Sequence, residues 1–586
     1  MSDWYIYNKK ENYEKLSHFN QLTSIQKLIL ANRDVVEENK VNSVVNSSLD
    51  RMYSPFLLKD MDQAVEILFN AMMQEFSIRI VGDYDADGVT STTILMKGLA
   101  YFYDDLSYVI PDRIEDGYGI NKNIVDQAYK DNVSLIITCD NGIAAFEAIE
   151  YARNKGIDVI ITDHHQTIKE DGRDLIPKAN AVVNPSQMEC RYPYKNICGA
   201  VVSYKLLDAF HERYGQEFGI SKEYIHDLLQ FAAIGTITDV MDLVDENRII
   251  VIEGLKRVNK TNNLGLMELI SQLDWNKEIT VYTIGFIIGP VINATGRLFT
   301  AKLAVELFLE DDPSVLVEYA RELIALNNDR KNITKTALED ALLLVEKDKL
   351  YKDDIIFLYM KDIHESICGL VAGRIKEIYN KPILVFTDAN SDTDKLLKGS
   401  GRSIEAYNMH EQLGKYKDYY LAFGGHKMAC GLTLTEENFQ EVKTLANRDS
   451  TLSQKDFNKT INIDAALDFR VINFDLVRQI QDLEPFGKAF EKPKFASKSV
   501  IINNIALLGK DKNLLKMTLT QNNKNIDSIS FNVLNDLQYL QSKFNINNIE
   551  RNFDQLLGKN IDIVYSIQIN KFRDKENIQL ILEEMR

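Results

Sequence analysis

The sequence contains few cysteines and no pairing pattern among them. The five cysteines, at positions 139, 190, 198, 368 and 430, form no CxxC motif. A zinc ribbon or a disulfide framework would need closely spaced cysteine pairs, so free thiols in a reducing compartment fit better. We therefore expect a cytoplasmic protein without disulfide bonds.

Long apolar runs are also missing. No stretch approaches the ~18 uninterrupted apolar residues of a membrane helix, and the opening residues MSDWYIYNKKENYEKL lack the apolar core of a signal peptide. An apolar content of 45% and a charged content of 26% are those of an ordinary soluble protein. Because 586 residues exceed what one core can organise, we expect three or four domains.

Positive charge is scarce. The net charge of -18 at pH 7 argues against a general electrostatic attraction to nucleic acid. The charge is uneven, however, because residues 455–586 contain 19 Lys and Arg against 17 Asp and Glu. A carboxylate-rich metal site would also make the rest of the chain acidic, so net charge alone does not identify the partner.

Strand-like and helix-like segments alternate in the first half of the chain. The β-type runs are 77–82, 106–110, 135–137, 159–161 and 181–183, and helices are expected at 90–103, 121–130 and 144–155. This alternation predicts a mostly parallel sheet. The region that follows, 198–330, is predicted to be mainly helical.

The predicted fold class is α/β with several domains. We expect an N-terminal helical segment at 1–75, a parallel-sheet α/β domain at 76–312, a long helical connector at 313–349 and a second α/β domain at 350–454. Residues 455–586 are rich in Asn, Ile and Lys with short alternating runs. That pattern favours a small all-β domain, an OB-type barrel.

Four acidic stretches lie at or just past apolar runs. They are DYDADG at 83–88, CDNG at 139–142, TDHH at 162–165 and TITD at 236–239. Because the carboxyl ends of neighbouring parallel strands meet at one edge of a sheet, such carboxylates and imidazoles make a divalent-metal site. Two metals a few ångström apart are a common device for hydrolysing phosphodiesters.

The first stretch offers three carboxylates. If the segment is extended, Asp83, Asp85 and Asp87 point the same way and converge. Gly88 then allows a tight turn into the next helix. Alone, this stretch is equally typical of a calcium loop or a solvated turn.

The other stretches add single acids and two imidazoles. Asp140 and Asp163 are expected at strand ends near a topological switch point. His164 is a metal-ligand type, whereas His165 is compatible with metal binding, phosphate binding or orienting its neighbour. Asp239 must reach the site from a helical region. Each stretch alone fits a turn, a cap or an exposed acid, but the four together favour a metal site.

The order DYDADG, TCDNG, TDHH and IGTITDV resembles the four motifs of the DHH phosphoesterase superfamily. From about residue 50 to the C-terminal barrel, the chain resembles one branch, the RecJ single-strand-specific 5′→3′ DNA exonucleases. The resemblance implies a DHH domain, a DHH-associated domain and two Mn²⁺ or Mg²⁺ ions. The implied metal ligands are Asp83, Asp85, Asp87, Asp140, His164 and Asp239. By the same resemblance, Asp163 and His165 belong to the core site.

Further stretches match this branch: PVINATGR at 290–297, HESICGLVAGR at 364–374, GSGRS at 399–403 and GGH at 424–426. The resemblance implies a pocket for a terminal 5′-phosphate, because arginine forks and glycine-rich turns both bind such anions. The expected pocket residues are Arg113, Arg297, Ser400 and Arg402.

The resemblance implies further substrate contacts outside that pocket. His426 is expected at the scissile phosphate, as a catalytic residue beside Asp163, His164 and His165. Asn293, His364 and Arg374 are further substrate-binding candidates. The competing interpretation is helix packing for His364 and Arg374, and structural ion pairs for Arg113 and Arg297.

LEPFG at 483–487 matches the stretch that precedes the family's OB domain, although this chain then departs from the family pattern with KAFEKP at 488–493. OB barrels bind single strands by aromatic stacking in a basic groove. The competing interpretation of these aromatics is barrel core. The candidates are Phe531, Tyr539, Phe544, Lys512 and Lys516.

The predicted function is a two-metal exonuclease that degrades single-stranded DNA 5′→3′, releases 5′-mononucleotides and acts in DNA repair and recombination. The implied partners are single-stranded DNA, a single-strand-binding protein and a helicase, and we expect a monomer without membrane attachment. The rivals are an enzyme for short oligonucleotides or cyclic dinucleotides, a pyrophosphatase, and a scaffold that lost its metals. The retained acids disfavour the scaffold, and the additional terminal regions favour a long polymer.

Overall fold

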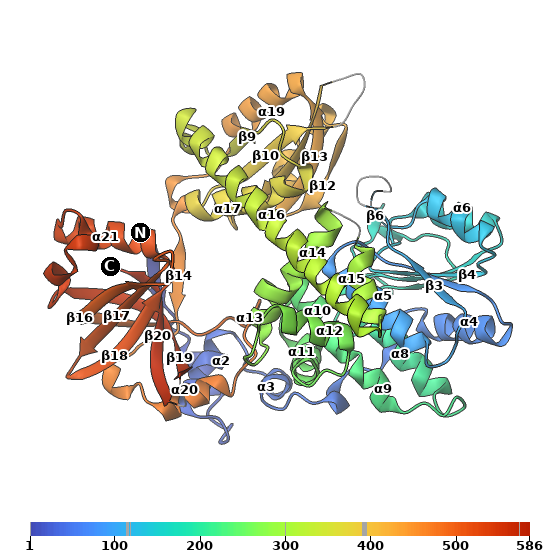
Figure 1. The fold of residues 1–586 in the computed structure, drawn as a ribbon, viewed down its shortest axis with the longest axis horizontal. Helices are drawn as coiled ribbons and strands as arrows, with labels where there is room; N and C mark the ends of the chain where they lie inside the picture. The colour runs from blue at the N-terminus through green and yellow to red at the C-terminus, as the bar shows by residue number, and fades with distance from the viewer. Residues whose placement is uncertain (1, 113–116, 118, 299–300, 390–394, 573–574) are drawn as a thin grey trace. The chain divides into compact units, whose positions relative to one another are not determined.

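The computed structural model describes residues 2–112, 117, 119–298, 301–389, 395–572 and 575–586. Its internal contacts divide the chain into two compact units (Figure 1). The larger unit comprises residues 49–241 and 249–458, and the smaller unit comprises residues 1–48, 242–248 and 459–586. The short segment 242–248 therefore leaves the larger unit, and the chain then returns to it.

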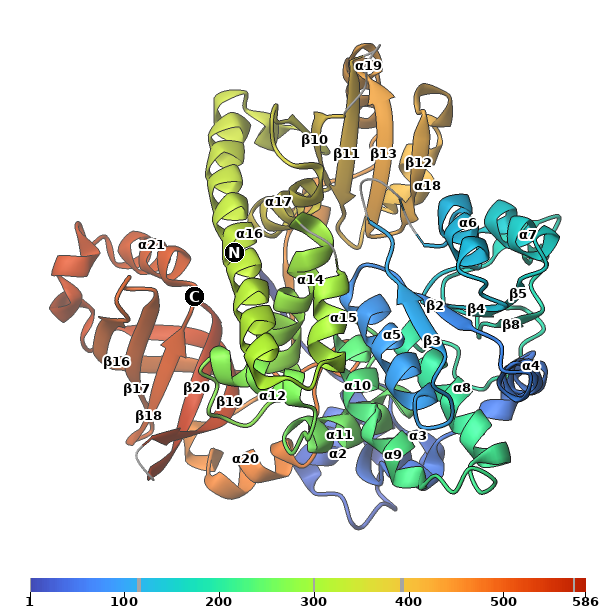
Figure 2. The ribbon, with the colours of Figure 1, turned by 45° about the vertical axis from the view of Figure 1, so that its right-hand side comes forward.

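The first sheet of the larger unit has five parallel strands in the order β3-β2-β4-β5-β8. Helices cover both faces: α6 and α7 pack on one, and α5 and α8 on the other (Figure 2). The central strands β2, β4 and β5 are therefore almost fully buried, and the predicted parallel sheet is confirmed. The strands are β2 (Ile78–Val81), β3 (Leu106–Val109), β4 (Leu135–Cys139), β5 (Asp158–Thr162) and β8 (Ala181–Val183). The helices are α5 (Ala86–Leu99), α6 (Lys122–Lys130), α7 (Phe146–Asn154) and α8 (Gly199–Tyr214).

The strand order reverses beside β2. The chain passes from β2 to β3 on one side and then crosses to β4 on the other side. This is a topological switch point, where ligands bind at the carboxyl ends of the strands in open α/β sheets. Asp83 and Asp140 follow β2 and β4 within two residues, so the fold brings them to this point.

Further helices follow the first sheet in the larger unit. α5 packs between α8 and the buried helix α10 (Leu229–Thr238). The long helix α16 (Pro313–Lys347) begins with an Asp312 cap and a proline in its first turn, a typical helix start. It packs on α12 (Leu264–Gln272), α14 (Gly289–Leu298) and α15 (Lys302–Leu309), and also on α17 (Glu365–Tyr379). The long helix predicted before the second α/β domain is thus present.

The second sheet of the larger unit is mixed, in the order β12-β13-β11-β10-β9. Only β9 and β10 are parallel, and the other neighbours are antiparallel. Together with α17 and α19 (Glu436–Arg448), it forms the predicted second α/β domain. The strands are β9 (Ile356–Tyr359), β10 (Ile383–Asp388), β11 (Leu396–Arg402), β12 (Ala422–His426) and β13 (Ala429–Thr435).

The C-terminal part of the smaller unit is a closed β-barrel, as predicted. Strand β16 pairs with β17 and also with β19, which closes the ladder β16-β17-β18-β20-β19. Closure leaves these strands without free edges. The strands are β16 (Phe495–Leu508), β17 (Leu514–Gln521), β18 (Lys524–Ser530), β19 (Asn560–Phe572) and β20 (Lys575–Met585).

The predicted N-terminal helical segment is divided in the structure. Residues 1–48 belong to the smaller unit, where β1 (Asp3–Ile6) pairs in parallel with β14 (Thr460–Ile463). Helix α4 (Met61–Met73) belongs to the larger unit and packs on α8. The strand β1 was not predicted, because its partner lies far along the chain and local pattern does not reveal it.

A buried arginine ties the segment 242–248 into the smaller unit. Arg248 is fully buried, and its guanidinium donates hydrogen bonds of 2.8, 2.8 and 2.9 Å to the backbone carbonyls of Leu483, Pro485 and Glu484. The same guanidinium lies 5.0 Å from the centre of the Phe490 ring. Burial lowers the pKa of Arg248 to about 10, so the group stays charged at neutral pH. A charge this deep is tolerated because carbonyl dipoles replace water.

All five cysteines are free and buried. Burial raises the pKa of Cys139, Cys368 and Cys430 to about 12, so these thiols stay protonated at neutral pH. Within the part of the chain that the structure describes, no helix has both the length and the apolar character needed to cross a membrane.

Replacing Arg248 by Met should destabilise the smaller unit by about 3 kcal/mol or more, since three buried carbonyls lose their donor. Urea denaturation followed by circular dichroism measures the effect. The exposed Lys256 on the same helix, α11 (Asp245–Val258), supplies the control Lys256→Met, which should cost less than about 1 kcal/mol. Equal unfolding midpoints for Arg248→Met and wild type would contradict the role of Arg248.

Candidate metal centre

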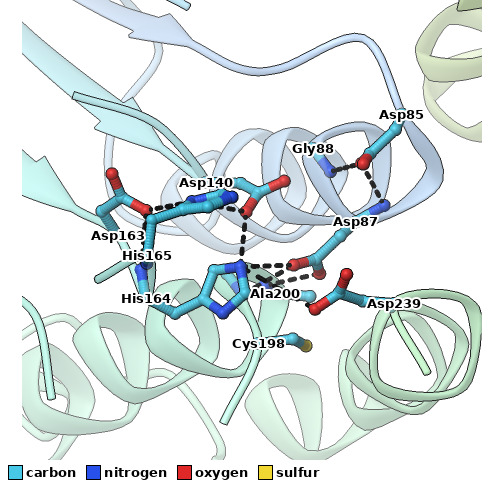
Figure 3. Close-up of polar contacts among 12 residues, drawn as sticks. Asp85, Asp87, Gly88, Asp140, Asp163, His164, His165, Cys198, Ala200 and Asp239 are labelled. Atoms are coloured by element: carbon cyan, nitrogen blue, oxygen red, sulfur yellow. Dashed lines mark hydrogen bonds and ion pairs between the residues drawn. The ribbon is translucent and has the colours of Figure 1, made fainter. Parts of the chain in front are cut away.

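Acidic residues and two imidazoles gather at the switch point of the first sheet (Figure 3). They form three groups in which the ligand atoms lie within 4.8 Å of one another. The groups are Asp83, Asp85 and Asp140; Asp87, His164 and Asp239; and Asp140, His164 and His165. All six residues expected to be metal ligands occur in these groups. Two of the groups share Asp140 and two share His164, so the three form one continuous centre.

The loop Asp83–Asp87 enters a helix earlier than predicted. Asp85 caps α5 and accepts hydrogen bonds from the backbone N–H groups of Asp87 (2.9 Å) and Gly88 (3.0 Å). Asp87 already lies in the first helical turn, so the expected extended segment ends before it, although all three carboxylates reach the centre. A Cβ on Gly88 would lie 2.4 Å from the Asp83 carbonyl oxygen, so only glycine fits there.

The N-terminus of α8 holds the carboxylate of Asp87. Asp87 accepts hydrogen bonds of 2.7 Å from Gly199 N–H and 2.9 Å from Ala200 N–H. Helix N-termini stabilise anions, because their N–H groups and dipole face the charge. A Cβ on Gly199 would lie 2.5 Å from Cβ of Asp140, so glycine lets this helix end approach the centre. Sequence reasoning missed this contact, although Cys198-Gly199-Ala200 opens an apolar helical run.

Asp239 reaches the centre from the end of α10, as predicted. It is the C-cap residue of that helix, and its Oδ2 lies 3.8 Å from His164 Nε2. α10 can run close to α5 and α8 because residue 235 is glycine. A Cβ at this position would lie 2.6 Å from Ala200 Cβ and 2.6 Å from Asp87 Oδ1. The close approach of three helices therefore gives the second group its geometry.

His164 lies between the two acidic groups. Its Nε2 is 3.1 Å from Asp140 Oδ1 and 3.8 Å from Asp87 Oδ2. Burial lowers the pKa of His164, which keeps its ring nitrogens available as ligands. The pKa of Asp140 is raised well above its usual value. Burial is the largest cause, and the negative charges of Asp87, Asp85 and Asp83 add to it.

These donors fit two divalent cations. Crowded carboxylates repel one another, and positive ions between them would relieve that repulsion. Carboxylate oxygens with one imidazole suit Mn²⁺ and Mg²⁺. The nearby Cys198 is no competing thiolate, because burial raises its pKa well above the usual value.

Asp163 organises the TDHH turn and occurs in none of the three groups. Its carboxylate accepts hydrogen bonds from the backbone N–H groups of Ile143 (2.9 Å), His164 (2.7 Å) and His165 (3.1 Å). It also lies 2.8 Å from His165 Nδ1. Burial opposes protonation of His165, but this contact and nearby acids outweigh it and raise the pKa of His165 to about 9. Asp163 therefore orients the imidazole of His165.

Asn293, expected to bind substrate, instead contacts the metal loop. Its Oδ1 accepts a hydrogen bond of 2.8 Å from Ala86 N–H. A Cβ on Gly296 would lie 2.2 Å from the Tyr84 carbonyl oxygen, so α14 packs directly on this loop. Arg113 lies outside the described residues. Arg297 lies in α14, but its side chain is outside them as well.

The expectation that GSGRS and GGH are glycine-rich turns is wrong, because they lie in strands β11 and β12. The backbone of β11 pairs with strands on both sides, and β12, an edge strand, pairs with β13. Tight packing explains the glycines of β11: a Cβ on Gly399 would lie 2.5 Å from the Phe386 ring, and one on Gly401 would lie 2.5 Å from the Met409 sulfur.

Ser400 and Arg402 share the opposite face of β11. Across the sheet, Ser400 is level with Gly431 and Gly424, while Arg402 is level with Ala429 and His426. These small residues leave a flat surface between Arg402 and the exposed His426. We call these six residues the serine–arginine face.

Helix α17 lies against this face. A Cβ on Gly369 would lie 2.9 Å from Arg402 Nη2 and 3.2 Å from Ser400 Oγ, so glycine makes room for both groups. His364 caps α17 through Nδ1, which accepts a hydrogen bond of 3.3 Å from Ser366 N–H. Arg374 is exposed and lies 3.3 Å from Glu377. His364 thus stabilises the start of α17, and Arg374 forms an exposed ion pair with Glu377.

The candidate DNA-binding residues of the barrel differ in their surroundings. Phe531 is 69% exposed, whereas Tyr539 and Phe544 pack against the barrel core. Lys516 lies 2.9 Å from Asp527, and Lys512 lies 3.5 Å from Glu550. Phe531 is therefore the aromatic candidate that is available for stacking.

Comparisons with known proteins agree with this architecture. The chain matches the DHH family, N-terminal domain, over residues 77–236, the DHHA1 domain over residues 352–449 and the RecJ OB domain over residues 463–584. The single-stranded-DNA-specific exonuclease RecJ of Haemophilus influenzae is 32% identical over 557 residues, 92% of this chain and 92% of that protein. RecJ of Bacillus subtilis is 33% identical over 536 residues, 91% of this chain, but this chain spans only 64% of that longer protein.

A solved structure shows the same fold. RecJ from Thermus thermophilus in complex with Mn²⁺ aligns with a TM-score of 0.79 at 24% identity, over 100% of this chain and 79% of that chain.

The helix end at Gly199 provides a test of the centre. Gly199→Ala should weaken Mn²⁺ binding by about tenfold or more, because the new Cβ would force α8 away from Asp87 and Asp140. Isothermal titration calorimetry with MnCl₂ measures the affinity. Gly414→Ala is the control, since its nearest neighbour would be 3.6 Å away. Unchanged Mn²⁺ affinity in Gly199→Ala would argue against a centre built on the α8 terminus.

Proposed function

Because this chain belongs to the RecJ family of single-stranded-DNA-specific exonucleases, we propose that it hydrolyses single-stranded DNA from the 5′ end and releases 5′-mononucleotides. The observation that carries the proposal is that two donor groups adjoin. Asp83, Asp85 and Asp140 form one, and Asp87, His164 and Asp239 form the other. They meet where Asp140 Oδ1 lies 3.1 Å from His164 Nε2. Two cations held by these adjoining groups would suit the hydrolysis of one phosphodiester.

Each of the two groups would hold one cation. Asp83 and Asp85 would serve the first and Asp87 and Asp239 the second, with Asp140 and His164 between them. When bound, the two ions supply Lewis-acid activation of water and neutralise charge on the phosphate. The protein supplies the fixed geometry, in which helix-end N–H groups orient Asp87 before substrate arrives.

Two imidazoles are the candidates for contact with the scissile phosphate. His165 is oriented by Asp163 through Nδ1, and its imidazole would donate a hydrogen bond to a phosphate oxygen. His426 stands exposed at the end of β12 and supplies a second donor. Both residues are assigned as phosphate ligands.

The serine–arginine face would bind the terminal 5′-phosphate. Arg402 offers a fork of donors and Ser400 a hydroxyl on the same side of β11. Arg113 and Arg297 are assigned to the same pocket by the family resemblance. Anchoring the 5′ end in a fixed pocket would set the direction of digestion and the length of the product.

The cellular role follows from the same family. We assign the protein to DNA repair and recombination, with a helicase that supplies the single strand and a single-strand-binding protein that keeps it open. We also assign activity to the monomer.

Digestion of end-labelled DNA in Mn²⁺ tests the reaction. The 5′ label should leave single-stranded DNA as mononucleotide while 3′-labelled strands shorten in a ladder, and duplex DNA should persist. Asp140→Asn should reduce the rate at least about a hundredfold by removing a shared ligand. Glu170→Gln, at an exposed position, should not change the rate. Release of the 3′ label first, or activity confined to a cyclic dinucleotide, would refute the assignment.

The role of the serine–arginine face has a separate test. Gly369→Ala should raise KM for 5′-phosphorylated single strands about tenfold, because the methyl group would crowd the Arg402 guanidinium. KM for strands with a 5′-hydroxyl should stay the same. Gly373→Ala on the same helix is the control, since no atom lies within 4 Å of its new Cβ. An equal change in KM for the two substrates would show that the serine–arginine face does not bind the 5′-phosphate.

A further inference from the structure

Two aromatic rings stand exposed and stacked on the surface of the larger unit. Tyr282 is 62% and Phe286 is 69% exposed. Their ring centres are 4.9 Å apart and their planes differ by 27°. Among the described aromatics of the larger unit, the next most exposed is Tyr129, at 54%. Large apolar groups exposed together, rather than singly, mark interaction surfaces.

The rings belong to a continuous helix with an unusual turn. Helix α13 (Val281–Thr283) passes through a π-helix (Ile284–Ile288) into α14 (Figure 1). Ile284 and Ile288 are buried, so the core is complete without the two rings. π-helical turns are rare and occur frequently at functional sites.

This helix packs on the end of α10 that carries a proposed metal ligand. A Cβ on Gly289 would lie 2.5 Å from Thr238 Cγ2, and one on Gly285 would lie 3.6 Å from Ile237 Cγ2. Thr238 directly precedes Asp239. Along their own helix, the two rings lie about one to two turns from Gly289, which packs against Thr238 beside the proposed ligand Asp239.

The same helix leads to the metal loop. Asn293 lies seven residues beyond Phe286 on it. Asn293 contacts Ala86 at the start of α5, beside Asp85 and Asp87. One continuous helix thus carries both the stacked rings and the side chain that contacts the metal loop.

We propose that Tyr282 and Phe286 form a stacking platform for unpaired bases of the DNA strand whose phosphodiester is hydrolysed at the metal centre. This inference rests on the proposed function and adds a site to it. Every base presents a flat π-face, so stacking would act without regard to sequence. In a duplex those faces are covered by neighbouring bases, and the platform would therefore favour single strands.

The chemistry of the chain favours bases over other occupants. With a net charge of -18, the protein gains little from long-range attraction to a polyanion. Stacking supplies affinity that does not depend on that attraction. Two stacked rings with exposed faces also suit a planar base better than the convex side chains of a protein partner.

The experiment compares Tyr282→Leu/Phe286→Leu with wild type on a long single-stranded oligonucleotide and on the p-nitrophenyl ester of thymidine 5′-monophosphate. Leu keeps apolar bulk but removes the π-face. KM for the oligonucleotide should rise about tenfold or more, with kcat unchanged. Hydrolysis of the small ester, which is too short to reach the platform, should stay at the wild-type rate.

A second readout reports stacking directly. Oligonucleotides with single 2-aminopurine bases are titrated into the metal-free proteins. Fluorescence should be quenched at one or two positions by wild type and not by the double Leu variant.

The matched control is Tyr101→Leu/Tyr224→Leu. These rings are also half-exposed, at 38% and 48%, and 4.9 Å apart. Tyr101 follows the far end of α5, about 20 Å along the helix from the metal loop. This variant should match wild type in both assays.

The outcomes separate the two proposals. If wild type does not degrade single strands, the proposed function fails. If wild type degrades them and the double Leu variant has the same KM and the same quenching, the platform is refuted while the function stands. A loss of small-ester hydrolysis in the double variant would likewise refute the platform, since it would show damage to the metal centre.

Discussion

Repulsion among carboxylates at one edge of a parallel sheet is the constraint on which the larger unit is built. Strands and helices deliver acids to a space where their ligand atoms lie within 4.8 Å of one another. Backbone N–H groups stabilise these charges: Asp85 and Asp87 each accept two, and Asp163 accepts three. Helices can approach this closely only where glycine replaces a side chain, as at Gly199 and Gly235. These glycines and the acids of the centre therefore act together, because the glycines let helix N–H groups and helix ends come close enough to stabilise the carboxylates.

Much of this centre could be predicted from sequence, because strands buried on both faces are short apolar runs and the acids follow them directly. The geometry of Asp87 could not, since it depends on where α5 begins and on N–H groups of α8 that lie far along the chain. The glycines of GSGRS were misread as a turn, because a glycine required by cross-sheet packing looks the same in sequence as one required by a bend. The pairing of β1 with β14 is equally invisible to local pattern.

An acidic enzyme that acts on a polyanion must gain affinity locally. The chain carries a net charge of -18, so contacts with cations at the metal centre, with Arg402 and with unpaired bases would have to outweigh a repulsive background. Such contacts are short-ranged and geometric. Selectivity for a single strand then arises from which chemical groups a strand exposes rather than from how much charge it has.

The smaller unit is assembled from residues 1–48, 242–248 and 459–586, and this has a consequence for synthesis on the ribosome. Strand β1 is translated long before its partner β14, which begins only at Thr460. At ordinary elongation rates the N-terminal segment waits roughly half a minute to a minute and a half for that partner. During this interval its apolar side chains, including Leu16, Ile29 and Leu30, have no barrel to pack against. The N-terminal segment of a nascent chain of this design therefore cannot complete its core until residues 459–586 have been translated.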